Sequence, residues 1–323
     1  MWFALTQDQE ALRDAARDLL ARRCPPAVVR AAWPDGDRST VDDLWRHLVG
    51  MGLPAAGVPA ERGGPGLDEV AMAALLAEVG YAAVPLPVAE TAAVAGPLVG
   101  DGTARIALVD ASGVVAYAQI ADAFLVLHDG PVRLVDRGAV PVAAVSTVDG
   151  SLAAGRVSIP DGAGRLVTAD PELVALTRER ATLAGAAQLI GLSRRMLDLT
   201  TGYVSARRQF GVPVGGFQAV AHRLADALLR LEFAAPAVLA AGWALATEPS
   251  TAAPPVSMAA VLATEAAREM ARTALQCHGA IGHTVEYDLH LFAKRAWALA
   301  ARVDLDAHLD RLAEALDLKG AGP

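Results

Sequence analysis

With 323 residues, the chain is long enough to bury a large core, and its length favours two or three subdomains. A net charge of −8 excludes a basic nucleic-acid-binding or membrane-binding surface. Cys24 and Cys277 lie far apart without a metal-type partner motif, so neither a disulfide framework nor a metal site is expected. The sequence shows no secretory signal and no apolar run of membrane length, and a cytoplasmic protein is therefore expected.

Helical patterns fill the first hundred residues. Three helices are each expected to begin at a side chain that can cap a helix: Thr6, Thr40 and Asp68. Thr6 and Gln9 form a capping box, and the helix that they open is expected to end before Pro25. An alanine-rich fourth segment covers about 87–99. Residues 1–104 are therefore predicted to form a helical domain.

The pattern changes near Arg105, where short apolar runs begin. Six runs predict strands: Ile106–Val109, Val114–Tyr117, Phe124–Leu127, Val132–Val135, Val140–Val145 and Val157–Ile159. They predict a small antiparallel β domain over residues 105–168.

Longer helical patterns follow. The first begins at Asp170, which precedes a proline at the first helical position, and is predicted to run to Phe210. Three further helices are expected at about 217–247, 256–277 and 287–301. A short terminal helix begins at Asp304. Residues 169–323 are predicted to form an antiparallel four-helix bundle, so the fold class is mainly α with a small β domain.

The corner between the first two bundle helices, Tyr203–Gln218, has the most distinctive sequence. It places Arg207 and Arg208 beside an amide, an aromatic ring and a glycine-rich turn, so positive charge adjoins backbone that can approach a ligand closely. Such a corner suits a phosphate-bearing ligand. The alternative is a helix C-terminus at which the arginines complement the helix dipole and Gly211 ends the helix.

Three stretches share the pattern of one known family: Phe3–Gln9, Arg207–Gly211 with Gln218, and Gln276–Gly282 followed by Glu286–Tyr287. Together with the order of helices, β domain and bundle, they make the chain similar to the acyl-CoA dehydrogenase family over nearly its full length. The stretch Gly282–Arg295 resembles the shorter actinobacterial members used in lipid and steroid degradation. The resemblance implies FAD-dependent α,β-dehydrogenation of an acyl-CoA thioester, such as a steroid side-chain thioester.

In this family, the flavin of FAD lies against the β domain of its own subunit, and the adenosine and pyrophosphate reach a neighbouring bundle. The resemblance implies seven cofactor contacts: Arg207, Gln209, Phe210, Gln218, Gln276, Gly279 and Ala280. Arg207 would hold the pyrophosphate through charge-assisted hydrogen bonds. Ala280 departs from the usual family glycine. Each position also has an ordinary structural explanation, such as a helix cap for Gln276 or interface packing for Phe210.

The family reaction requires a carboxylate within reach of the substrate α-proton. One family position follows the fourth bundle helix, where this chain has Ala301–Asp304 and no glutamate. The other falls at Ala181 by spacing back from Arg207. Glu179 and Asp304 are the nearest acids, but Glu179 faces another side of its helix and Asp304 suits a cap. No catalytic base is therefore assigned.

The predicted β domain also lacks two family segments that line the flavin, one with Thr-Glu-Pro and a Gly-Ser pair and one with Trp-Ile-Thr. Our first hypothesis is a half-site subunit that completes the FAD site of a longer acyl-CoA dehydrogenase subunit in an α2β2 heterotetramer. One alternative is a self-sufficient homo-oligomeric dehydrogenase with a non-standard base. The other is a flavin-free scaffold subunit.

Overall fold

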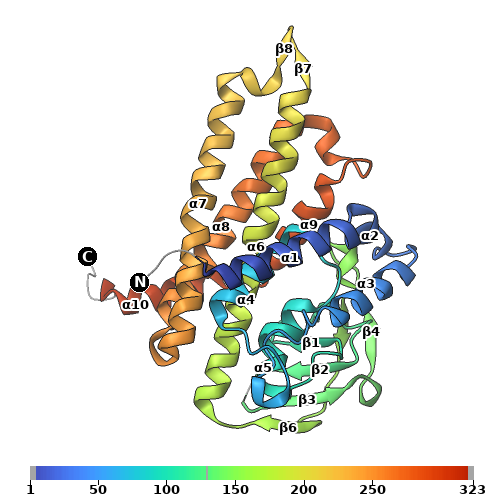
Figure 1. Ribbon diagram of the computed structural model, residues 1–323, viewed down its shortest axis with the longest axis vertical. Helices are drawn as coiled ribbons and strands as arrows, with labels where there is room; N and C mark the ends of the chain where they lie inside the picture. The colour runs from blue at the N-terminus through green and yellow to red at the C-terminus, as the bar shows by residue number, and fades with distance from the viewer. Residues whose placement is uncertain (1–4, 129, 319–323) are drawn as a thin grey trace.

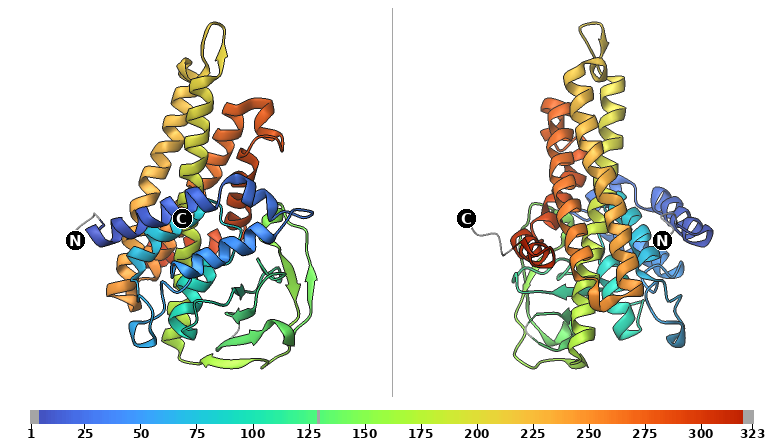
Figure 2. Two further views of the ribbon diagram at one scale, coloured as in Figure 1. Left: turned by 45° about the vertical axis from the view of Figure 1, so that its right-hand side comes forward. Right: turned by 90° about the vertical axis from the view of Figure 1, so that its left-hand side faces the viewer.

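The computed structural model describes residues 5–128 and 130–318. Long helices form a bundle along the molecule, shorter helices cross one side of it, and a small sheet lies at one end (Figures 1 and 2). The mainly α class with a small β part is therefore confirmed. The domain limits at residues 104 and 168 stay predictions.

The N-terminal helices are α1 (Gln7–Arg23), α2 (Pro26–Ala31), α3 (Ser39–Gly50), α4 (Glu69–Tyr81) and α5 (Gly96–Val99). The capping box at the start of α1 is confirmed, since Thr6 Oγ1 accepts from the Gln9 N–H at 3.3 Å and Gln9 Oε1 accepts from the Thr6 N–H at 3.0 Å. Asp68 caps α4, as predicted. In the first matching family stretch, residues 3 and 4 lie outside the described residues.

One prediction in this part is wrong. Thr40 is not the cap of α3, because the Asp37 carboxylate accepts from the Ser39 N–H at 3.0 Å and the helix begins at Ser39. The alanine-rich fourth segment is helical, and it consists of a π-helical stretch, Glu90–Ala95, followed by α5. Sequence reasoning also missed α2, which begins directly at a proline.

The main sheet has the order β1-β2-β3-β6. Its strands are β1 (Ile106–Val109), β2 (Ala123–Val126), β3 (Val132–Asp136) and β6 (Arg165–Thr168), and a separate pair is formed by β4 (Val142–Ala144) and β5 (Gly155–Val157). The expectation of a purely antiparallel sheet is wrong, because β1 and β2 run parallel and the chain between them crosses back over the sheet. The predicted strand at 114–117 is reduced to a single bridge between Val115 and Gly155. Sequence reasoning missed β6.

The C-terminal helices are α6 (Pro171–Ala206), α7 (Gln218–Thr247), α8 (Ala253–His278), α9 (Leu289–Ala300) and α10 (Leu305–Ala315). The first four pack against one another as the predicted bundle. Asp170 caps α6 by accepting from the Glu172 N–H at 3.0 Å. The helix ends at Ala206 rather than Phe210, because the chain turns into a β-hairpin of β7 (Arg208–Gln209) and β8 (Val212–Pro213).

Helix α7 is long and apolar enough, by length and composition, to cross a membrane, which sequence reasoning did not foresee. Only 33% of its most apolar window is buried. One side of the helix packs on α4, α6 and α8. The other side therefore presents apolar side chains outside the core.

Candidate functional site

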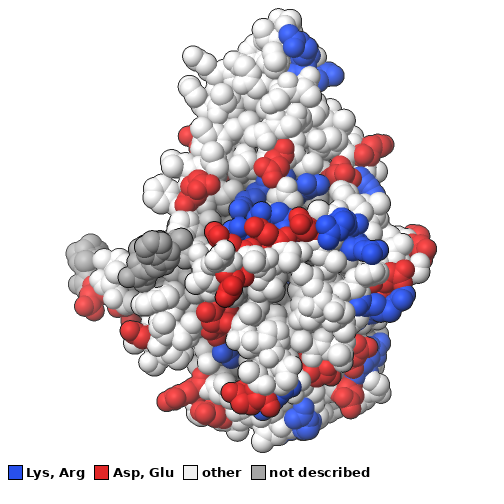
Figure 3. Space-filling model, in the orientation of Figure 1, with Lys and Arg blue, Asp and Glu red and all other residues white. Residues whose placement is uncertain are grey.

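The Tyr203–Gln218 corner is a projecting hairpin and not a simple helix end. Phe210 and Gly211, at its tip, both have positive φ, 50° and 83°. This is the backbone twist that two-residue hairpin turns require. The hairpin projects from the end of the bundle opposite the sheet, and basic side chains lie along one side of it near the tip (Figures 1 and 3).

The hairpin side chains point away from the core. Phe210 is 93% exposed, and its ring meets the Phe217 ring edge to face, at 6.3 Å between ring centroids. Arg208 donates to the Gly211 carbonyl at 3.1 Å, which braces the turn. Arg207 makes no side-chain hydrogen bond or ion pair within residues 5–128 and 130–318. The hairpin therefore offers an unpaired cation and an unburied aromatic ring to another molecule.

An aromatic cluster joins this corner to the Gln276–Gly282 stretch. The rings of Tyr203 and His278 stack at 4.5 Å, and Tyr287 packs against both. Burial lowers the pKa of His278, while its Nδ1 contact with the Ala274 carbonyl, at 2.8 Å, opposes that shift. The ends of α6 and α8 are thereby fixed side by side.

All seven predicted cofactor contacts are solvent-exposed at this end of the bundle: Arg207, Gln209, Phe210, Gln218, Gln276, Gly279 and Ala280. Gly279 has a φ of 64°, and a Cβ built there or at Gly211 would meet nothing within 4 Å, so both backbones are open to close approach. The structure brings these residues together at one end, and their role in binding stays a prediction.

A second region gathers the two family positions for the catalytic base. Ala181 from α6 and Arg302 and Val303 from the segment after α9 line one cavity of about 180 Å³. Neither position supplies a carboxylate. Arg302 instead forms an ion pair with Asp110, at 2.8 Å between Nη2 and Oδ2, so a paired cation lies at a position where the resemblance implies a base. A guanidinium cannot accept a proton in this role.

Glu90 of the π-helical stretch also lines this cavity, and sequence reasoning missed it. Its side chain is buried, and burial raises the pKa of its carboxyl, while Arg302 and Arg295 oppose this shift. The signal in the sequence is a single acid within the alanine-rich segment at 87–99. A lone acid in an apolar run suggests a buried carboxyl group, and a carboxyl group is seldom fully buried without a partner.

The two acids considered from sequence do not line the cavity. Glu179 forms an ion pair with Arg311 of α10, at 2.8 Å, and burial raises the pKa of its carboxyl against the effect of that arginine. Asp304 caps α10 by accepting from the Ala307 N–H at 3.1 Å. Both acids therefore have structural partners away from the cavity.

Arg295 anchors α9, the helix whose Leu299 lines the cavity. Its buried guanidinium pairs with the buried Asp149 carboxylate and donates to the Val84 carbonyl at 2.9 Å and to Ser151 Oγ at 2.7 Å. Burial opposes its ionisation, but Asp149, Tyr117 and Glu90 together raise the pKa of Arg295. This network ties the bundle to the β part and to the segment after α4.

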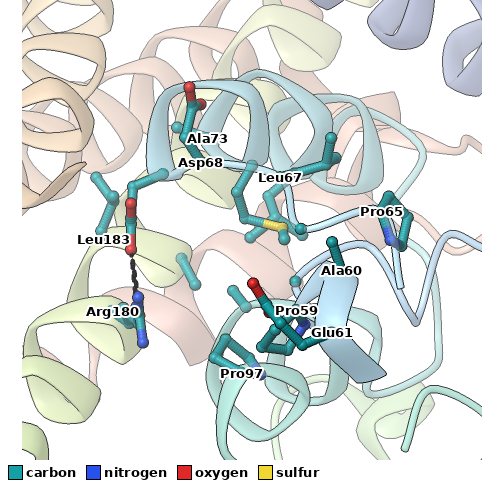
Figure 4. Close-up of a pocket in the computed structure, with 17 residues that line it drawn as sticks. Pro59, Ala60, Glu61, Pro65, Leu67, Asp68, Ala73, Pro97, Arg180 and Leu183 are labelled. Atoms are coloured by element: carbon teal, nitrogen blue, oxygen red, sulfur yellow. Dashed lines mark hydrogen bonds and ion pairs between the residues drawn. The ribbon is translucent and has the colours of Figure 1, made fainter. Parts of the chain in front are cut away.

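A further pocket of about 390 Å³ lies between α4, α6 and the loop at 57–68 (Figure 4). Met72 and Leu183 contribute apolar walls, and an ion pair between Arg180 and Glu69, at 2.7 Å, closes one side. Ala184 lines both this pocket and the smaller cavity. The pocket contains neither family base position.

The chain belongs to the acyl-CoA dehydrogenase family. Residues 6–106 match the acyl-CoA dehydrogenase N-terminal domain, and residues 173–301 match the C-terminal domain. The described structure has the corresponding fold, with a helical start, a small β part and a C-terminal helical bundle.

Among curated relatives, the acyl-CoA dehydrogenase IpdE2 of Mycobacterium tuberculosis is 33% identical over 90% of this chain and 91% of its own length. The acyl-CoA dehydrogenase FadE34 of the same organism is also 33% identical over 90% of this chain, but that match covers 45% of FadE34. A chain in the crystal structure of the ChsE4-ChsE5 complex from Mycobacterium tuberculosis superposes with a TM-score of 0.84, at 24% identity and over 100% of both chains. That superposition shows the shared fold.

Proposed function

We propose that this chain is a subunit of a heteromeric, FAD-dependent acyl-CoA dehydrogenase. It supplies the adenosine and pyrophosphate side of a cofactor site whose flavin wall and catalytic base belong to a longer partner subunit. The observation that carries the proposal is a contrast between two regions of this chain, the hairpin and the two positions where the resemblance implies a base. Its Arg207 hairpin is exposed and unpaired, while both family base positions, Ala181 and Ala301–Asp304, lack a glutamate.

The exposed end of the bundle fits the phosphate-bearing part of FAD. Arg207 would bind the pyrophosphate, Gln209 and Gln276 would add polar contacts, and Phe210 would lose its exposure to water on packing against the cofactor. The open backbone at Gly279 leaves room for a close approach. Bound FAD would accept the hydride from the acyl β-carbon, and these residues would hold and orient it.

The chain's own cavity fits that reaction poorly. It measures about 180 Å³, and Arg302 and Asp110 are paired within it. An acyl thioester that entered would meet the Arg302 guanidinium at a position where the resemblance implies a base, and a guanidinium cannot accept the α-proton. This supports placing the base on the partner.

Two solved complexes of related fold support a partner and a substrate class. One is the ChsE4-ChsE5 complex, and the other is the steroid ACAD Tcur3481-Tcur3483, with a TM-score of 0.82 and 24% identity over 98% of this chain and 99% of that chain. We therefore propose an α2β2 assembly in the cytoplasm that acts on an acyl-CoA with a bulky acyl group, such as a steroid side chain.

The test is the flavin content of the chain made alone and made together with its partner. The isolated chain is expected to carry no stoichiometric FAD, and the complex is expected to be yellow and to oxidise acyl-CoA. Absorbance of released flavin, divided by the concentration of each chain, measures this directly. Stoichiometric FAD and acyl-CoA oxidation in the isolated chain would refute the half-site proposal.

One observation favours a second candidate, a self-sufficient dehydrogenase. The Glu90 carboxyl is buried in the cavity onto which both family base positions open, and its raised pKa suits a group that must accept a proton. In that case Glu90→Gln would abolish turnover of the isolated chain while its FAD content stayed unchanged. Turnover that survives this substitution excludes Glu90 as the base.

A further inference from the structure

The Glu90 carboxyl lies at the wall of the cavity beside α6 and α9 without a partner from the rest of the described chain. Glu90 is 8% exposed, and it lines this space of about 180 Å³. No hydrogen bond or ion pair joins its side chain to another residue within 5–128 and 130–318. Because buried polar groups are nearly always hydrogen-bonded, an unpaired carboxyl at a cavity wall indicates a site for a hydrogen-bonding molecule.

The charges around Glu90 are balanced without it. Arg302 and Arg295 are the cations that act on its carboxyl. Arg302 pairs with Asp110 at 2.8 Å between Nη2 and Oδ2. Arg295 pairs with the buried Asp149 carboxylate. An ionised Glu90 would therefore add an uncompensated negative charge to a buried region, which is costly. The balance favours the neutral carboxyl, which can donate one hydrogen bond through its O–H.

The backbone at Glu90 has an irregular geometry that is typical of functional positions. Glu90 begins the π-helical stretch Glu90–Ala95, and π-helical turns of this kind occur frequently at functional sites. Val94 of the same stretch also lines the cavity. The stretch therefore presents one polar and one apolar side chain to the same space.

Most of the remaining cavity wall is apolar or already hydrogen-bonded. Thr182 and Gln188 line it, but each donates to a backbone carbonyl of α6, at 3.1 and 3.3 Å. His308 of α10 is held by Ser257 Oγ, which lies 3.0 Å from its Nδ1. The unpaired acid of this wall is therefore Glu90. The apolar members of the wall include Val94, Leu108, Ala181, Leu299 and Val303.

The cavity is small, and its wall is not closed. Pockets for drug-sized ligands measure about 300–1,000 Å³. This one is smaller, at about 180 Å³, so it suits a ligand of a few heavy atoms. Thr182 and Gly185 on its wall are only half-buried, which gives such a ligand a route from solvent.

We propose that this cavity binds a small neutral carbonyl compound whose oxygen accepts a hydrogen bond from the protonated Glu90 carboxyl. An anionic ligand would find both nearby guanidiniums already paired, and a cationic ligand would lie beside two arginines. A neutral carbonyl oxygen accepts the free O–H without adding charge, and the apolar wall covers the rest of the molecule. Amides and ketones belong to this class.

The inference goes beyond the half-site function, because the cavity lies within this chain and away from the hairpin. In this role Glu90 donates a hydrogen bond and accepts no proton. It therefore differs from the role of Glu90 as the base of a self-sufficient dehydrogenase.

The first test compares three probes with the same carbon skeleton on the full-length chain: isobutyramide, isobutyrate and isobutylamine. Affinities are measured by ligand-observed NMR titration of the unaltered protein and of Glu90→Leu. The affinity for isobutyramide is expected to fall about 5- to 100-fold in Glu90→Leu, because its carbonyl loses a donor in a buried site. Equal affinity in the two proteins overturns the proposal. Tighter binding of isobutylamine than of isobutyramide also overturns it, since that result requires an ionised Glu90.

The second test follows isobutyramide binding as the pH rises. Above the folded pKa of Glu90 the carboxyl loses its O–H, so the affinity is expected to fall about tenfold for each pH unit. Glu90→Gln keeps a donor that does not titrate, so its affinity is expected to stay constant. An equal fall in Glu90→Gln would assign the effect to His308, which lines the same cavity, and would overturn the role of Glu90.

The other groups near Glu90 do not confuse this measurement. Arg302 and Arg295 keep their charge, because their carboxylate partners raise the pKa of each. Burial raises the pKa of Tyr117, so this phenol stays neutral. The pKa of Asp110 is lowered, although burial opposes the effect of Arg302, so Asp110 stays ionised.

The third test fills the cavity and leaves Glu90 unchanged. A Cβ built at Gly185 of α6 meets nothing within 4 Å, so Gly185→Met can place a flexible side chain in this space. It is expected to abolish isobutyramide binding at every pH. Gly202→Met, at another open glycine of the same helix, is the matched control and is expected to bind as the unaltered chain does. Binding that survives in Gly185→Met would place the ligand elsewhere and overturn the proposal.

Discussion

The hairpin end of the bundle and the cavity beside α6 and α9 each contain an arginine, and the two arginines differ in whether they have an ion-pair partner. Arg207, on the hairpin, has no partner within the described residues, whereas Arg302, in the cavity, is paired with Asp110 at 2.8 Å. Nearby Phe210 is 93% exposed, and Glu90 in the cavity is buried. A cation left unpaired beside an unburied ring is available to another molecule, but a cation paired inside the fold contributes to packing.

The half-site proposal gives the two regions different roles. In that proposal, the hairpin end supplies side chains to a cofactor site that another subunit completes. The cavity beside α6 and α9 has the positions where the resemblance implies a base, but these positions have no glutamate. Each can be altered separately, and the expected effects fall on different measurements: interior changes on stability, and hairpin changes on flavin binding.

The largest effect on stability is expected from Arg295→Met. The substitution leaves the Asp149 carboxylate buried without its partner, and it removes donors from Val84 and Ser151. Breaking one side of a buried ion pair costs about 3–5 kcal/mol, so the free energy of unfolding in urea is expected to fall by about that amount. Arg13→Met, in a more exposed pair with Asp14, is the control and is expected to cost much less, because solvent screens an exposed ion pair. An equal loss of unfolding free energy in the two variants would mean that the buried network stabilises the fold no more than an exposed ion pair does.

A pH-dependent effect is expected from Glu90→Gln. Burial raises the pKa of Glu90 in the folded protein, so the folded state holds this proton more tightly than the unfolded state does. The stability of the unaltered protein therefore falls as the pH rises from the unfolded pKa, near 4.5, to the higher folded pKa. The Glu90→Gln variant does not lose stability in this way. Its free energy of unfolding in urea is therefore expected to exceed that of the unaltered protein at pH 8, and the difference is expected to disappear near pH 4. A difference in unfolding free energy that does not depend on pH would contradict a raised pKa of the buried Glu90 carboxyl.

The smallest effect on stability is expected from Phe210→Ala. The ring is almost fully exposed, so its loss is expected to change the free energy of unfolding of the isolated chain by less than about 0.5 kcal/mol. In the complex, the same substitution is expected to speed FAD release, because the ring would no longer pack on the cofactor. A stability loss above about 1 kcal/mol, with FAD release unchanged, would show that the ring serves the fold.

Local signals in the sequence predicted much of the helical architecture. The caps at Thr6, Asp68 and Asp170 act over two or three residues and appear as expected. The corner at Tyr203–Gln218 was also found, but its hairpin shape was not. Both Phe210 and Gly211 take positive φ there, and this conformation is not expected from the sequence because it is uncommon for a phenylalanine.

The ion pairs in and around the cavity could not be predicted from the sequence, because they join residues far apart in the chain. Arg302 meets Asp110 across 192 positions, and Arg295 meets Asp149 across 146. The parallel pairing of β1 with β2 is also a long-range result, since short apolar runs do not specify strand direction. The resemblance implies base positions at Ala181 and at Ala301–Asp304, which have no glutamate, and that implication stays a prediction. The structure adds that Ala181, Arg302 and Val303 line one cavity.

The most direct test of the half-site proposal is FAD binding by the assembled complex that carries Arg207→Ala. Loss of a charge-assisted hydrogen bond costs about 1.5–3 kcal/mol, so the affinity for FAD is expected to fall about 10- to 100-fold while the subunits stay together. Arg46→Ala on α3, which removes another exposed cation, is expected to leave the affinity unchanged. An Arg207→Ala complex that binds FAD as tightly as the unaltered one would contradict the half-site account and favour a flavin-free scaffold.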